Sequence, residues 1–279
     1  MRNNAIIRII IFSIVIVILL GILLAGLGFG ALMTHLNAEK TDYSTARAPT
    51  VLFPLEEVRN IQIDWAAGNI EIIAGDVDSI QVTESGSFSE QEAMAYKQAG
   101  ETLYIRFKKE TVTFDTFSVA HKDLTVTVPR DWVCQKLTLD VASANITVDT
   151  LTASYVNLNT ASSDSVFKAC HITDLDVNTA SGSVEYQGIL NTLDCDAASG
   201  RFTGVFDNTP SAINMDSASG DLDITLPRDS GFRVEMDALS GRFTTDFPVT
   251  TRGDSYIHGD CACEIEYDGV SGNVMVLMG

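Results

Sequence analysis

A short motif recurs seven times in the second half of the chain, and this repetition limits the possible folds more than any other feature. In each copy, two stretches of alternating apolar and polar residues flank a turn of small residues built around one serine. Most copies are 18 to 21 residues apart, and glycine usually follows the serine. The shared serines are Ser143, Ser162, Ser181, Ser199, Ser219, Ser240 and Ser271, with an earlier related copy that has Ala67 in this place.

The alternation and the short repeat together indicate the fold class. Alternation with a period of two is typical of half-buried strands. A unit of about 19 residues is too short for a propeller blade and suits stacked short coils. We therefore predict an all-β, single-stranded β-solenoid or β-roll-like ectodomain over residues 58–279, with the repeats clearest from 124 to 279. Residues 89–98 are predicted to form a short helix, and it is left open whether residues 76–122 join the same solenoid.

Stacking in register would place equivalent residues in columns about 4.8 Å apart, with the serines from Ser143 to Ser240 in one line. Cys195 falls in an inward column. Cys261 and Cys263 lie four and two residues before Ile265, so strand alternation is expected to point them inward as well. We expect these three to be core-filling free thiols, in preference to disulfides or a metal site. The two inward columns are Leu137, Val156, Leu175, Leu193, Ile213, Val234 and Ile265, and Leu139, Leu158, Val177, Cys195, Met215, Met236 and Tyr267.

A further column, three residues before each serine position, contains only aspartate or asparagine. The favoured interpretation is structural, because such side chains bond to turn backbones and stacked asparagines form amide ladders. The alternative is a weak calcium site, since carboxylates one strand apart repel and attract cations. The column is Asp64, Asp140, Asn159, Asn178, Asp196, Asp216, Asp237 and Asp268, and the candidate metal ligands are Asp140, Asp196, Asp216, Asp237 and Asp268.

An uncharged apolar stretch near the amino end predicts a membrane anchor. It is longer than the apolar core of a signal peptide, so residues 9–34 are expected to form a single transmembrane helix. Arg2 and Arg8 on its amino side place residues 1–8 in the cytoplasm and the rest outside the plasma membrane. Residues 35–57 are expected to be an irregular tether. Within the helix, Gly26 and Gly30 form a GxxxG step that suits packing against a membrane-protein partner.

The charge of the expected ectodomain excludes one class of partner. Two of the 18 basic residues precede the apolar stretch, which leaves 16 basic and 37 acidic residues beyond it and a formal charge of −21. Such a surface repels nucleic acid and attracts cationic ligands.

No catalytic constellation stands out in the sequence. The histidines have no metal-ligand spacing, the repeated serines lack a nucleophile-elbow motif, and the evenly repeated acids single out no acid and nucleophile pair. We therefore predict a protein that is not an enzyme and has no cofactor. The alternative is a polysaccharide-acting β-helix enzyme or a divalent-cation-binding surface module. The four histidines are His35, His121, His171 and His258.

The Asp-x-Ala-Ser-Gly cores, the paired LTVTVPRD and LDITLPRD segments at Leu124 and Leu222, and the amino-terminal apolar stretch resemble a bacterial family. This family is labelled "putative adhesin", is a domain of unknown function and includes LiaG-type membrane proteins. The resemblance covers Val58 to Gly279. It implies a right-handed or roll-like β-solenoid outside a mostly Gram-positive cell, with an adhesive role towards a cell-wall ligand or an accessory role in an envelope-stress system. It brings no catalytic residues.

Overall fold

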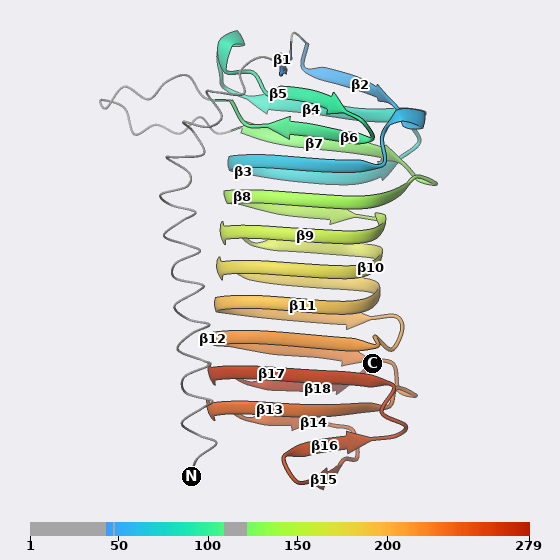
Figure 1. The fold of residues 1–279 in the computed structure, drawn as a ribbon, viewed down its shortest axis with the longest axis vertical. Helices are drawn as coiled ribbons and strands as arrows, with labels where there is room; N and C mark the ends of the chain where they lie inside the picture. The colour runs from blue at the N-terminus through green and yellow to red at the C-terminus, as the bar shows by residue number, and fades with distance from the viewer. Residues whose placement is uncertain (1–42, 47, 109–121) are drawn as a thin grey trace, which may run out of the picture.

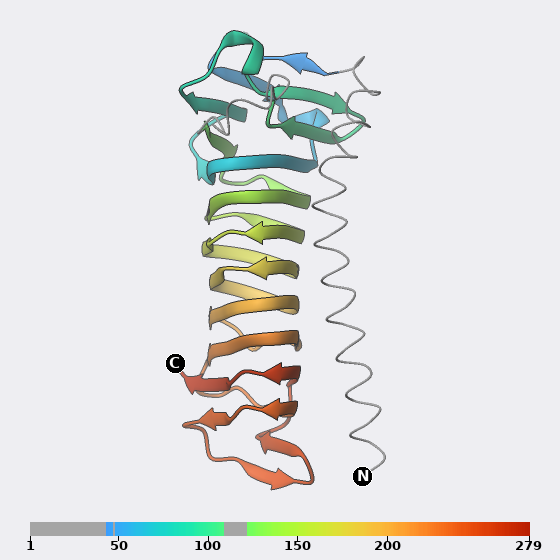
Figure 2. The same ribbon diagram turned by 90° about the vertical axis from the view of Figure 1, so that its left-hand side faces the viewer.

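The computed structural model describes residues 43–46, 48–108 and 122–279, and most of them belong to one 18-stranded sheet. The sheet winds into coils that stack along one long axis, with the layers of the stack visible in Figure 1 and, after a quarter turn, in Figure 2. The prediction of an all-β, solenoid-like fold is confirmed. The central coils are β3 (Asn60–Gly75), β8 (Val133–Asp149), β9 (Thr152–Ser162), β10 (Ser165–Ser181), β11 (Ser183–Phe206) and β12 (Ala212–Leu226).

The register between coils is parallel and follows the alignment of the sequence repeats. Between β11 and β12, Leu193 pairs with Ile213, Cys195 with Met215 and Ser199 with Ser219. The side chains of both predicted inward columns are buried, except that Met236 is only half-buried. Burial of this apolar surface stabilises the stack at about 25 cal/mol per Å².

Glycine at the bends lets consecutive coils approach closely. Gly182 has a φ of +122°, and a Cβ atom there would lie 2.0 Å from the backbone oxygen of Ser163 in the preceding coil. Gly272 faces the backbone oxygen of Gly220 in the same way, also at 2.0 Å. A side chain at either position would collide with backbone, so the repeat needs glycine there.

The amino-terminal end of the stack differs from the parallel coils because its strands include antiparallel pairs. Residues 50–54 form β2, which pairs antiparallel with β4, so the prediction of an irregular tether is wrong for this part. The predicted helix over 89–98 is also wrong beyond its first turn, because only η2 (Glu90–Glu92) is helical, with a capping box at Ser89, and strand β5 follows. This end contains β1 (Ser44–Thr45), β2 (Thr50–Pro54), η1 (Leu55–Glu57), β4 (Ser79–Gly86), β5 (Ala95–Ala99), β6 (Thr102–Arg106) and β7 (Lys122–Pro129).

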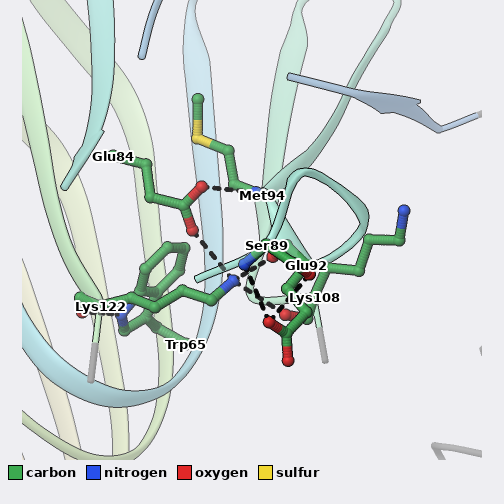
Figure 3. A network of polar contacts seen from close by, with 7 residues as sticks. All are labelled: Trp65, Glu84, Ser89, Glu92, Met94, Lys108 and Lys122. Atoms are coloured by element: carbon green, nitrogen blue, oxygen red, sulfur yellow. Dashed lines mark hydrogen bonds and ion pairs between the residues drawn. The ribbon is translucent and has the colours of Figure 1, made fainter. Parts of the chain in front are cut away.

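A buried ion pair fastens this end of the molecule (Figure 3). Lys122 is fully buried, and its Nζ lies 3.1 Å from Oε1 of Glu84, whose side chain is 2% exposed. The same ammonium group donates to the backbone oxygens of Glu92 and Lys108, and the other carboxylate oxygen of Glu84 accepts from the backbone nitrogen of Met94 at 2.6 Å. Both charges are therefore satisfied by groups from several segments. Burial lowers the pKa of Lys122, and the neighbouring Glu84 opposes this shift.

At the other end of the stack, the order of the coils departs from the order of the sequence. Strand β17 lies between β12 and β13 and pairs in parallel with both (Figure 1). Ser271 therefore pairs with Ser219 on one side and with Ser240 on the other, so the expected line of serines holds only with this rearrangement. This end contains β13 (Phe232–Ser240), β14 (Phe243–Thr245), β15 (Thr250–Arg252), β16 (Ser255–His258), β17 (Cys263–Ser271) and β18 (Val274–Met278).

The cysteines occupy the core with one exception. Cys195 and Cys263 are buried as predicted, and burial raises the pKa of each thiol to about 12. Cys261 is only half-buried, so its predicted inward position is wrong. Its φ of +60° turns the chain just before β17 and breaks the strand parity on which the prediction rested.

The predicted cytoplasmic tail, transmembrane helix and first part of the tether lie outside the described residues. Within the described residues, no helix has the length and apolar character that a membrane crossing requires.

Candidate functional site

Six carboxylates gather on the outward side of the sheet in the carboxy-terminal half of the stack, and we call this group the acidic face. Strand alternation places them there, because each is next to a residue of an inward column, such as Cys195 or Tyr267. Asp196 pairs with Asp216, Asp216 with Asp268, and Asp268 with Asp237, so four of the six form one ladder. The acidic face comprises Asp194, Asp196, Asp216, Asp237, Glu266 and Asp268.

The same column is chemically different in the amino-terminal half, where each member has a polar partner. Nε of Arg106 lies 2.8 Å from Oδ2 of Asp64. The side-chain nitrogen of Asn159 donates to Oδ1 of Asp140 at 2.8 Å, and that of Asn178 donates to Oδ1 of Asn159 at 3.2 Å. This amide ladder confirms the structural interpretation for these positions. The bonds run between side chains of stacked coils, however, and not to the turn backbone.

On the acidic face, the repulsion between neighbouring carboxylates is not offset by partners of this kind. Within the described part of the chain, no side-chain hydrogen bond or ion pair reaches any of its six carboxylates. Burial, followed by the charge of neighbouring carboxylates, raises the pKa of Asp194, Asp196 and Asp268. The strongest effect is at Asp216, where burial and the charges of Asp196 and Asp268 raise the pKa to about 6. The face thus combines high negative charge with partial desolvation.

The predicted metal ligands do not assemble into a closed site. Asp196, Asp216, Asp237 and Asp268 lie in one ladder, whereas Asp140 belongs to the amide ladder several coils away. In residues 43–46, 48–108 and 122–279, no group of three or more acidic, histidine or cysteine side chains converges on a point that could hold an ion. The arrangement suits a diffuse attraction for cations across a flat surface better than chelation.

The raised pKa of Asp216 predicts a pH dependence of stability. Because its folded-state pKa of about 6 exceeds the usual 3.8, the folded protein binds the proton more tightly, and stability should increase as pH falls from 7 through 6 towards 4. Asp216→Asn should raise the melting temperature at pH 7 and reduce the gain seen between pH 7 and pH 5, as measured by thermal unfolding.

Asp221 is the matched control for this experiment, because hydrogen bonds from Asn273 and the charge of Arg201 lower its pKa. Asp221→Asn should therefore lower the melting temperature at pH 7. An unchanged pH dependence in Asp216→Asn would contradict the role assigned to Asp216.

Sequence reasoning missed a second polar feature, an open groove of about 380 Å³ along the serine and glycine bends. Oδ1 of Asp221 accepts from the backbone and side-chain nitrogens of Asn273 at 2.9 and 3.1 Å, and Oδ2 accepts from Arg201 at 3.0 Å. The sequence does contain a signal for this groove, because Asp or Asn recurs two residues after the serine position. The groove is lined by Gly200, Ser219, Gly220, Asp221, Ser240, Gly241, Ser271, Gly272 and Asn273.

Two of the four histidines, His171 and His258, lie within the described residues. His258 packs against the rings of Phe232 and Phe247, and its Nδ1 lies 2.8 Å from the backbone oxygen of Pro248. His171 is exposed on β10. Neither His171 nor His258 lies on the acidic face or in the groove. His35 and His121 lie outside the described residues.

Comparison with known proteins identifies one family and several similar crystal structures. A family model described as Toastrack DUF4097 matches residues 58–274. The chain is similar to the crystal structure of a "putative adhesin" from Bacteroides fragilis, with 14% identity, a TM-score of 0.43, and coverage of 83% of this chain and 98% of that one. A "putative cell adhesion protein" from Clostridium sporogenes has 10% identity, a TM-score of 0.41, and coverage of 85% and 100%. No curated protein matches the chain.

Proposed function

The chain belongs to the Toastrack DUF4097 family, and we propose that it is a non-enzymatic, membrane-anchored cell-surface protein that adheres to cationic ligands through its acidic face. The ligand class is a polymer or polypeptide that carries several positive charges, including amine-bearing material of the cell wall. The protein would be single-pass, with residues 1–8 in the cytoplasm and the solenoid outside the plasma membrane.

The acidic face is the observation that carries the proposal. Six carboxylates without a basic partner among the described residues lie on one flat side of the stack, and four of them lie on adjacent strands. Each such pair in water repels by about 1 kcal/mol, and by more where the side chains are partly desolvated. A polycation laid along the column would relieve this repulsion at several places at once, which favours a multivalent ligand over a single ion.

Two features of the sequence support the location. Residues 9–34 are long and apolar enough to cross a bilayer, and the basic residues on their amino side favour an inside orientation for that end. In this arrangement Gly26 and Gly30 would offer a packing surface to another membrane helix, which gives an accessory role in envelope stress a physical route.

The polysaccharide-acting enzyme is less well supported. Asp216 has the raised pKa that a general acid needs, but it lies in an evenly spaced ladder on a flat sheet face, and the groove at the bends does not include it.

Binding of fluorescent polylysine to the full chain in vesicles of neutral phosphatidylcholine tests the adhesive role. We expect binding that weakens with salt and falls at least about tenfold in Asp194→Asn/Asp196→Asn/Asp216→Asn. The fold should persist, because asparagine already occupies equivalent positions in other coils of the stack.

The control variant, Glu71→Gln/Glu185→Gln/Asp207→Asn, removes the same charge from outside the acidic face and should bind nearly as well as the unchanged chain. Equal losses in both variants would contradict a specific face. In a separate arm, protease added to intact cells without their wall should degrade the solenoid, and full protection would contradict the orientation but not the binding chemistry.

A further inference from the structure

The coil formed by β17 and β18, residues 263–279, sits in a slot between parts of the chain that precede it. We call it the inserted coil. On one side β17 and β18 pair with β12, and on the other β17 pairs with β13 and β18 with β14. We propose that the inserted coil exchanges between two copies of the chain, so that the slot of each copy is filled by the coil of the other.

The slot recognises the inserted coil through specific contacts as well as through strand pairing. Oη of Tyr267 donates to the backbone oxygen of Gly220 at 2.6 Å, and the hydroxyl of Ser271 donates to that of Ser219 at 3.3 Å. Gly272 packs against the same backbone oxygen of Gly220, where a Cβ atom would overlap. These contacts fit this segment, so the natural occupant in exchange is the identical segment of a second copy.

An empty slot would be costly, and for this reason exchange must be reciprocal. Ile265, Tyr267, Val274 and Val276 are at most 1% exposed, so withdrawal of the coil would open the core and leave two strand edges unpaired. A symmetric pair of copies restores every one of these contacts. Only the connection between β16 and β17 then differs between the closed chain and the exchanged dimer.

That connection, residues 259–262, has the features of a swapping hinge. Both Gly259 and Cys261 have left-handed backbone conformations, with φ values of +62° and +60°. Glycine tolerates this conformation, but Cys261 has a side chain and is strained by it. A short, strained hinge favours the open, exchanged form, in which the connection extends and Cys261 is released from the turn.

Disulfide trapping between two copies tests the exchange. The full chain with Cys261→Ser is expressed in one cell in two tagged versions, one with Ser219→Cys and the other with Ser271→Cys. The two new thiols become neighbours only if the inserted coil of one copy lies against β12 of the other. We expect a reducible heterodimer on a non-reducing gel, at least about fivefold above the control pair.

The control pair combines Ser181→Cys with Ser271→Cys, because Ser181 lies on the same edge but three coils from Ser271. A single chain with both Ser219→Cys and Ser271→Cys shows that the two cysteines can bond in the folded protein. Using Cys261→Gly as the background in place of Cys261→Ser should reduce the heterodimer, because glycine removes the strain of the hinge. If the single chain forms its disulfide while the heterodimer stays at the level of the control pair, the proposal is wrong.

Discussion

Replacing Lys122 with methionine is expected to lower the free energy of unfolding by about 3–5 kcal/mol, the cost of leaving a buried charge without its partner. In this variant the carboxylate of Glu84 would remain buried and would lose the ammonium group 3.1 Å away. The backbone oxygens of Glu92 and Lys108 would also lose a donor. Urea unfolding followed by circular dichroism measures the change.

Two variants give this prediction its controls. Arg130 and Asp76 form an ion pair in which both side chains are more than half exposed, so Arg130→Met should cost less than about 1 kcal/mol. The double variant Lys122→Met/Glu84→Leu removes both buried charges and should recover a large part of the loss. A loss in Lys122→Met no greater than in Arg130→Met would show that this ion pair does not hold the amino-terminal strands in place.

Gly182→Ala is expected to lower the free energy of unfolding by about 3 kcal/mol or more, through overlap and backbone strain acting together. Its Cβ atom would lie 2.0 Å from the backbone oxygen of Ser163, and its φ of +122° is one that side chains rarely adopt. Relief would require the two coils to separate, against the strand pairing that holds them.

Gly253→Ala is the matched substitution, because Gly253 also has a positive φ, at +63°, but no atom lies within 4 Å of the added Cβ. It should cost only about 1 kcal/mol, the strain of the left-handed conformation alone. The comparison is made by urea unfolding of the three proteins. Equal losses in the two variants would mean that close approach between coils does not determine the need for glycine at the bends.

The sequence was a good guide wherever the structure repeats. Strand alternation identified the inward columns, and the repeat alignment predicted the pairing of Ser199 with Ser219 and of Asp196 with Asp216. The repeat alignment also placed the ladder carboxylates of the acidic face in one column. Each of these predictions depends only on a local period and on register between equal units, and both can be read from the chain.

What the sequence did not reveal depends on contacts between unlike segments. The position of β17 between β12 and β13 follows from packing that no repeat period records, although the longer interval before Ser271 marked the place. Residues 95–99 contain good helix formers but pair with β6, because tertiary pairing overrides weak local preference. In the bonded half of the Asp/Asn column, the partner of Asp64 is Arg106, which is distant from it in sequence.

The place of β17 also sets an order of assembly. Coils from β8 to β12 can each form on the preceding one as soon as they are synthesised, because each pairs with earlier residues. Strand β13 pairs with β16 and β17 and must wait for residues made after it. Until then its apolar side chains, such as Phe232 and Val234, have no complete core, so the interval between synthesis of β13 and of β18 is when this chain is most exposed to aggregation.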